Sequence, residues 1–254
     1  MLAPTDNEMN LTVRAEDIMT LRKLLYHGRL ATGAAKVAAT MGFDAIPISR
    51  PDGKILEFWS RTDERMIRIR HAHRTAHDTS IESLLVPLGQ HVIQFVCYNS
   101  EIVGLIDASD LNKPIARIAW LHPMLELERS LLDAARMFKI TEGEQAAALG
   151  QHATIARKRQ TSAKRHDLGM PLLEYAQFAD LLRAGRYLGL LDLDDSAIKD
   201  LNDVRKRAAH SGDVVVENRG ECARLSGALA IARKAARQTQ GLRRRMRDAA
   251  PYAK

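Results

Sequence analysis

The stretch "VRKRAAHSGD" places three cations, a histidine and a turn signal within the ten residues Val204–Asp213. Arg205 and His210 are the pair in it with chemical potential. A histidine titrates near neutral pH and moves protons, and an arginine donates forked hydrogen bonds to phosphoryl oxygens. Together they suit metal-free cleavage of a phosphodiester. The alternative is a solvated basic helix end that satisfies its last carbonyl groups.

Helical geometry restricts how this pair can act. Five residues at about 100° each separate Arg205 and His210 by about 140° around one helix. Lys206 and Arg207, four and three residues before His210, are its neighbours on the helix face instead. Either His210 lies just beyond the helix end, or the active pair comes from two subunits. We expect Lys206 and Arg207 to support RNA binding. Glu128 is expected to face the same cleft as a supporting polar residue, and its alternative is a surface ion pair.

The elements that must position this pair are predicted to be helices. Apolar residues recur at three- and four-residue spacing through five segments. Five helices with few strand signals predict an all-α bundle over residues 115–240, followed by a basic tail over residues 241–254. The segments are "IARIAWLHPMLELERSLLDAARMF", "EGEQAAALGQHATIARKRQTSAKR", "PLLEYAQFADLLRAGRYLGLL", "DSAIKDLNDVRKRAAH" and "ECARLSGALAIARKAARQT".

Residues 1–114 have a different texture, because they contain an internal repeat. "IPISRPDGKILEFWSRTD" (Ile46–Asp63) aligns without a gap on "IQFVCYNSEIVGLIDASD" (Ile93–Asp110), an offset of 47 residues. Each copy predicts a strand, a polar turn, a second strand and a helix start. A helix is predicted before each copy, in "ATGAAKVAATMGF" and in "TSIESLLVPL", where Thr79 and Glu82 match a capping box. The sequence therefore predicts a duplicated α+β unit.

This duplicated region, from about Leu25 to Pro114, resembles a tandem pair of CBS domains, the Bateman module that senses nucleotides. The resemblance implies a cleft lined by a hydrophobic-x-x-Ser/Thr-x-x-Asp motif, which maps onto Ser60 and Asp63 in the first copy. In the second copy it maps onto Asp107 and Asp110, and Asp107 departs from the pattern because a carboxylate repels phosphate. A regulatory adenine-type nucleotide is therefore expected nearer the first copy. The alternative is a degenerate pair kept as a dimerisation scaffold.

The helical region resembles HEPN domains, because its Arg-x4-His motif falls near the end of the fourth predicted helix. Many such domains are metal-independent endoribonucleases that act as dimers through a composite cleft, and others only bind nucleotides or partners. The resemblance implies that Arg205 and His210 are catalytic and that RNA is the substrate. Lys206 departs from the family's usual Asn, Asp or His after the arginine and places an extra cation beside it.

Charge and composition agree with a protein that meets an anion. Residues 1–113 hold 13 Lys and Arg against 14 Asp and Glu, and residues 114–254 hold 25 against 17, so the net charges are −1 and +8. A basic half suits nucleic acid, although a solvated basic surface gives the same count. Two distant cysteines and no long apolar run favour a cytoplasmic protein without a membrane span. His71, His73 and His77 fit a linker better than a metal site.

The sequence thus predicts an α+β CBS pair joined to an all-α HEPN-like bundle. Its expected function is that of a nucleotide-regulated ribonuclease of the stress or antiphage type, a homodimer that needs no cofactor for catalysis. The rival is a non-catalytic sensor or adaptor that binds nucleotide or RNA. No Walker A, GxSxG, HExxH or dinucleotide fingerprint is present.

Overall fold

The computed structural model of the protein describes residues 12–21, 31–165 and 170–249. These residues form two compact units. The first contains the residues up to Ala119 together with Gly212–Ser226, and the second contains Trp120–Ser211 together with the residues from Gly227 onward. The expected start of the repeat near Leu25 and residues 250–254 of the expected tail lie outside the described residues.

Two sheets form the framework of the first unit. Their strand orders are β1-β7-β6-β5 and β2-β3-β4, and every neighbouring pair is antiparallel except β5 and β6, which are parallel. Short helical segments connect the strands. The elements are α1 (Ala15–Ile18), β1 (Thr20–Leu21), α2 (Ala31–Met41), β2 (Ala45–Ser49), β3 (Ile55–Ser60), β4 (Arg65–Arg68), η2 (His71–His73), β5 (Arg74–Ala76), α3 (Leu85–Gln90), β6 (Ile93–Tyr98), β7 (Glu101–Asp107) and η3 (Ala108–Asn112).

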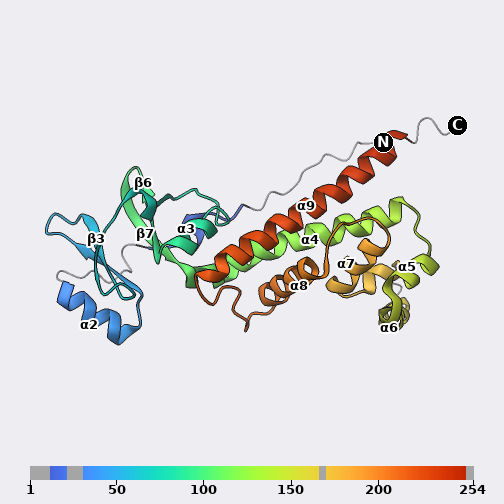
Figure 1. Ribbon diagram of the computed structural model, residues 1–254, viewed down its shortest axis with the longest axis horizontal. Helices are drawn as coiled ribbons and strands as arrows, with labels where there is room; N and C mark the ends of the chain where they lie inside the picture. The colour runs from blue at the N-terminus through green and yellow to red at the C-terminus, as the bar shows by residue number, and fades with distance from the viewer. Residues whose placement is uncertain (1–11, 22–30, 166–169, 250–254) are drawn as a thin grey trace. The chain divides into compact units, whose positions relative to one another are not determined.

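The core of the first unit joins the two sheets. Phe58 of β3 and Phe95 of β6 belong to one buried cluster, and their ring centroids are 5.7 Å apart. A second cluster packs Ala34 and Ala38 of α2 against Ile46 of β2, so α2 covers a face of the smaller sheet (Figure 1). The small alanine side chains allow this helix to approach the sheet closely, and the apolar surfaces of all three layers are removed from water.

The predicted strand–turn–strand unit is confirmed in both copies of the repeat. β2 pairs with β3, and β6 pairs with β7, as antiparallel hairpins. Their turns contain residues with left-handed backbone: Gly53 at φ 78° in the first, and Asn99 and Ser100 at φ 45° and 69° in the second. Gly and Asn tolerate this conformation, which explains why these polar turns stop the strands where they do.

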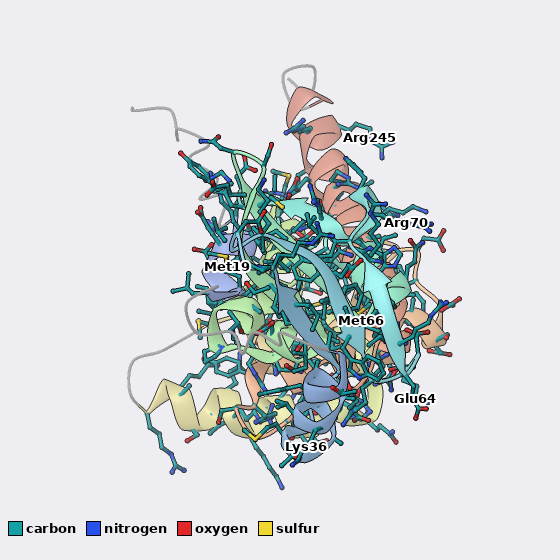
Figure 2. All side chains as sticks on the ribbon, turned by 90° about the vertical axis from the view of Figure 1, so that its left-hand side faces the viewer. Met19, Lys36, Glu64, Met66, Arg70 and Arg245 are labelled. Atoms are coloured by element: carbon teal, nitrogen blue, oxygen red, sulfur yellow. The ribbon has the colours of Figure 1, made fainter. Side chains whose placement is uncertain are left out.

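The predicted helix start is confirmed only after the second copy, where β7 leads into η3 and then α4 (Pro114–Met137). After the first copy the prediction is wrong. β3 turns instead through Glu64, at φ 49°, into the antiparallel strand β4, and Glu64 lies at the tip of this hairpin (Figure 2). The residues Arg65–Arg68 that follow carry apolar side chains only at Met66 and Ile67, which suits a short strand with both outer residues exposed.

The helix before the second copy also begins later than predicted. Thr79 and Glu82 do not form a capping box. Tight backbone turns run from Ser80 to Leu84, with Ser83 N–H donating to the Ser80 carbonyl at 3.0 Å, and α3 begins only at Leu85.

The described residues of the second unit form helical elements alone, as predicted. These are the greater part of α4 and of α9 (Gly220–Ala249), together with α5 (Glu142–Leu149), η4 (Gly150–His152), α6 (Ala153–Lys164), η5 (Leu172–Tyr175), α7 (Phe178–Tyr187) and α8 (Asp195–Ala209). Two predicted helices are each divided. Gly150, at φ 53°, separates α5 from α6, and Pro171 begins a 3-10 turn ahead of α7.

α4 and α9 lie side by side and run in the same direction (Figure 1). Thr239 Oγ1 of α9 is buried 3.0 Å from Ser130 Oγ of α4. One turn further, Arg243 Nη1 lies 3.2 Å from Asp133 Oδ2. Residues 241–249, expected to be a tail, continue α9 as helix. These two contacts join α4 to α9 within the second unit.

Candidate functional site

α8 positions the Arg205–His210 motif. Its start is fixed by Asp194, whose Oδ1 accepts a hydrogen bond from Ala197 N–H at 2.7 Å. A buried stripe that includes Ile198 and Leu201 holds the helix against its neighbours. The helix ends at Ala209, and His210 follows with extended backbone while its N–H donates to the Lys206 carbonyl at 3.1 Å. The His210 side chain is exposed and lies just beyond the helix, which is one of the two solutions that helical geometry left open.

Arg205 is half-buried one turn and a half before His210. Its guanidinium carbon lies 5.9 Å from the ring centroid of Phe178, the first residue of α7. Its Nε is buried and has no hydrogen-bond partner among the described residues. A buried unsatisfied donor costs about 1–3 kcal/mol, and stacking on an aromatic face returns about 0.5–2 kcal/mol. The contact with the ring therefore offsets part of this cost and uses none of the N–H donors of the guanidinium.

The other residues predicted for this site differ in their surroundings. Lys206 is exposed, and Arg207 Nε lies 3.2 Å from Asp203 Oδ2 on the same helix, so part of its charge is already balanced. Glu128 is half-buried on α4 and pairs with no cation among the described residues. The cationic character of the helix end thus comes mainly from Arg205 and Lys206.

The two residues of the first nucleotide motif, Ser60 and Asp63, form hydrogen bonds with each other. Ser60, the last residue of β3, is fully buried, and its hydroxyl donates to Asp63 Oδ2 at 2.6 Å. Asp63 N–H in turn donates to Ser60 Oγ at 3.2 Å. These bonds close the turn between β3 and β4. The Ser60 hydroxyl is therefore used within the turn, whereas the Asp63 side chain is exposed.

The second motif caps η3. Asp107 Oδ1 accepts from Ser109 N–H at 2.7 Å, and Asp110 Oδ2 accepts from Asp107 N–H at 2.9 Å. Asp110 is buried, and its Oδ1 lies 2.6 Å from Lys113 Nζ. Burial raises the pKa of the Asp110 carboxyl, and the hydrogen bond from Lys113 opposes that rise. Both carboxylate oxygens of Asp110 are therefore used within the protein.

Asn112, at the end of η3, is a residue that sequence reasoning missed. Its Oδ1 accepts from Val215 N–H at 2.8 Å and from Val216 N–H at 3.0 Å, and its Nδ2 donates to the Val216 carbonyl at 2.8 Å. We call this set the Asn112 contact. It attaches the segment that follows His210 to the element that carries Asp110. Asn112 and its partners are 103 and 104 positions apart in the chain, so no local sequence pattern predicts the contact.

A second missed group is an ionic cluster on α7. Asp180 is buried, with Oδ2 3.4 Å from His152 Nδ1 and Oδ1 3.0 Å from Arg183 Nη1. A histidine oriented by a carboxylate is a common proton-transfer arrangement, but Arg183 already balances this carboxylate. The cluster therefore ties η4 to α7.

Histidines of the linker gather without forming a metal site. No group of three or more His, Cys, Asp or Glu side chains in the described parts of the chain is arranged to hold a metal ion. The ring centroids of His73 and His91 are 4.7 Å apart. Burial lowers the pKa of His73, and the charges of His91 and Arg70 lower it further. The neutral ring is therefore the form that the fold favours.

Comparison with known proteins gives one kind of likeness. No family model matches the chain, and no curated protein matches it. Solved structures of CBS domains do match about two fifths of it. A CBS domain pair in complex with 5′-methylthioadenosine and S-adenosyl-L-methionine is 15% identical, with a TM-score of 0.34, and the match covers 40% of this chain and 94% of that one.

Two further matches have similar values. An uncharacterized conserved protein from Pyrococcus horikoshii is 18% identical, with a TM-score of 0.34, over 41% of this chain and 92% of its own. A CBS domain-containing protein of unknown function from Bacillus anthracis is 14% identical, with a TM-score of 0.35, over 42% and 95%. Among the described residues, no helix combines the length and apolar character that crossing a membrane requires.

Proposed function

We propose that the protein is a nucleotide-regulated, metal-independent endoribonuclease whose catalytic residues are Arg205 and His210. The observation that carries the proposal is the position of His210, exposed and directly beyond the end of α8. Arg205, whose Nε has no hydrogen-bond partner among the described residues, and Lys206 lie in the last turns of that helix. RNA is the fitting substrate because it carries its own nucleophile, so the protein need only move protons and stabilise charge.

The reaction proceeds as an internal transfer. The 2′-oxygen forms a bond to the adjacent phosphorus, and the bond from phosphorus to the 5′-oxygen breaks, which leaves a 2′,3′-cyclic phosphate and a 5′-hydroxyl. His210 donates a proton to the departing 5′-oxygen, and Arg205 stabilises the negative charge on the phosphoryl oxygens. In the proposed homodimer, a second His210 accepts the proton of the 2′-hydroxyl.

The first unit would regulate this site through an adenine-type nucleotide. Asp63 supports this role because an exposed carboxylate accepts hydrogen bonds from two vicinal ribose hydroxyls. The Asn112 contact supplies a route, since it fixes the backbone of Val215 and Val216, five and six residues after His210. A nucleotide that binds two arrangements of this segment unequally shifts their populations.

RNA cleavage in EDTA tests the catalytic proposal. The wild-type protein should cut mixed RNA into fragments that end in 2′,3′-cyclic phosphate. His210→Ala and Arg205→Ala should each lose at least about 100-fold in rate, the range typical of a removed proton-transfer or charge-stabilising group. His122→Ala is the matched control, because His122 lies 3.8 Å from Glu126 on α4 and has no proposed role. Undiminished cleavage by His210→Ala would refute the assignment.

Nucleotide binding has its own test. Calorimetry with AMP, ADP and ATP should detect binding to the wild type that is lost in Asp63→Ala. Asp52→Ala is the control, because Asp52 is an exposed carboxylate in the turn between β2 and β3 and has no proposed role. Its Oδ1 accepts from Lys54 N–H at 3.0 Å, and its Oδ2 lies 3.8 Å from Lys54 Nζ. Equal affinity in wild type and Asp63→Ala would remove Asp63 from the site.

The second candidate function is that of a non-catalytic sensor that binds nucleotide or RNA. The contact between Arg205 and Phe178 favours it, because packing on a ring gives this arginine a structural role without chemistry. In that case RNA remains intact in the EDTA assay and is retained by the protein.

A further inference from the structure

α6 presents one exposed face on which cations alternate with hydroxyl groups. Its side chains recur at intervals of three and four residues, so they lie on a single side of the helix. They line an open groove of about 480 Å³, formed by Thr154, Arg157, Lys158, Thr161, Ser162 and Arg165. We call this groove the α6 face. All six residues are exposed.

The opposite side of α6 belongs to the core. Ala153, Ala156 and Gln160 are buried, and Gln160 Nε2 donates to the Met170 carbonyl at 3.1 Å. Arg159 is exposed but donates to the Tyr175 carbonyl at 3.2 Å. The burial of Ala153, Ala156 and Gln160 therefore directs the α6 face outward.

No carboxylate of residues 12–21, 31–165 and 170–249 balances the charge of the α6 face. α6 contains no Asp or Glu, and Arg157, Lys158 and Arg165 pair with no carboxylate among the described residues. By contrast, Arg136, Arg183 and Arg186 of the same unit each lie within reach of a carboxylate. The three cations of the face are therefore available to pair with an anionic ligand.

The spacing fits a linear polyanion better than a compact one. At about 1.5 Å per residue, Arg157 and Arg165 are separated by roughly 12 Å along the helix axis, so the cations follow a line that is longer than one phosphate group. Lysine, arginine, serine and threonine are the side chains that contact nucleic-acid backbones. The six residues include no aromatic ring, so the face has nothing on which to stack a base.

We propose that the α6 face binds the phosphodiester backbone of the RNA substrate without regard to its sequence. This inference rests on the proposed function in that it supplies the ribonuclease with a substrate-holding surface away from α8. It assigns RNA recognition to Arg157, Lys158 and Arg165, with the hydroxyls of Thr161 and Ser162 donating to phosphate oxygens.

A second cationic surface in the same unit provides the matched control. Lys234, Arg237, Arg244 and Arg245 are exposed on α9, and Arg245 projects from the helix (Figure 2). Gln238 and Gly241 lie between them, so this surface lacks the alternating hydroxyls. It tests whether any three exposed cations of this unit suffice for RNA binding.

The experiment measures binding by the full chain carrying His210→Ala, so that cleavage does not consume the probe. Fluorescence anisotropy of a labelled 12-nucleotide oligouridylate in EDTA gives the dissociation constant at several salt concentrations. The triple variant R157Q/K158Q/R165Q should bind at least about 10-fold more weakly. Its slope of log affinity against log salt should fall by about 2, since each contact to a single strand contributes roughly 0.7. Glutamine preserves helix propensity, and circular dichroism verifies folding.

The control variant K234Q/R237Q/R244Q removes the same charge and should change affinity less than about threefold. Equal losses in the two triple variants would overturn the proposal, because they indicate a diffuse electrostatic field. Unchanged binding by the α6 variant would overturn it as well, and so would competition by polyglutamate as strong as that by RNA. If wild-type protein binds RNA through the α6 face but never cuts it, the ribonuclease proposal fails and this one stands.

Discussion

Replacing Gly104 with alanine should weaken the attachment of β1 to the larger sheet. Gly104 is buried on β7 opposite Leu21 of β1. A Cβ there would lie 2.7 Å from Met19 Sδ and 2.8 Å from the Thr20 carbonyl oxygen. The methionine side chain can move, but the carbonyl is backbone, so β1 must shift. Overpacking of this kind costs about 1–3 kcal/mol.

Gly33 provides the opposite case in the same unit. It is exposed within α2, and nothing lies within 4 Å of a Cβ at that position. Gly33→Ala should therefore stabilise the first unit by about 0.5–1 kcal/mol, because alanine loses less backbone freedom in a helix.

Urea unfolding, followed by circular dichroism and tryptophan fluorescence, measures both variants. With an m-value of about 2 kcal/mol/M, the midpoint should fall by about 1 M for Gly104→Ala and rise by a few tenths for Gly33→Ala. A Gly104→Ala midpoint equal to that of the wild type would refute the close approach of β1. It would also remove the physical reason why the second repeat has glycine where the first has Glu57.

Three further changes test the ionic and polar contacts. Because the pKa of His73 is lowered in the folded protein, the unfolded chain takes up this proton first as pH falls, so the free energy of unfolding should decrease below about pH 6.5. His73→Gln should therefore reduce the change in urea midpoint between about pH 7.5 and 5.5. The same pH dependence in His73→Gln and the wild type would contradict this. Lys113→Met should lower the free energy of unfolding by roughly 1–3 kcal/mol, because it leaves Asp110 buried without its cation. The double variant that adds Asp110→Asn should recover part of this loss in the same urea assay. Thr239→Val should lower the free energy of unfolding by roughly 0.5–1.5 kcal/mol, because it removes the hydroxyl bond to Ser130. An unchanged free energy of unfolding would show that the bond contributes nothing.

The repeat predicted the two hairpins, because alternating apolar residues indicate the strands and residues that tolerate a left-handed backbone, such as Gly53 and Asn99, indicate the turns. It failed after the first copy because Ser60–Asp63 and Asp107–Asp110 are both compatible with a turn and with a helix start. The residues that follow decide between the two. Met66 and Ile67 continue a strand, whereas Pro114 begins a helix with a fixed φ.

The helical unit was predictable in class but not in its divisions. Apolar spacing marks a helix on both sides of Gly150, and only the backbone of that glycine, at φ 53° and ψ −128°, breaks it. β5 escaped prediction for another reason. Its three residues pair in parallel with β6, and parallel pairing depends on a long crossover connection that leaves no local signal.

The motif of α8 shows most clearly what spacing alone can and cannot decide. The interval between Arg205 and His210 excludes a shared helix face, and the turn signal at Ser211 and Gly212 favours an early helix end, so the exposed position of His210 follows from local sequence. The orientation of Arg205 does not, because Phe178 belongs to a different helix. This contact makes Arg205→Lys the sharper substitution in the cleavage assay. Lysine keeps the charge but lacks the planar guanidinium that packs on a ring and donates two parallel hydrogen bonds. Loss of cleavage in Arg205→Lys would therefore mean that catalysis needs the guanidinium group. Retained cleavage would mean that any cation at the end of α8 suffices.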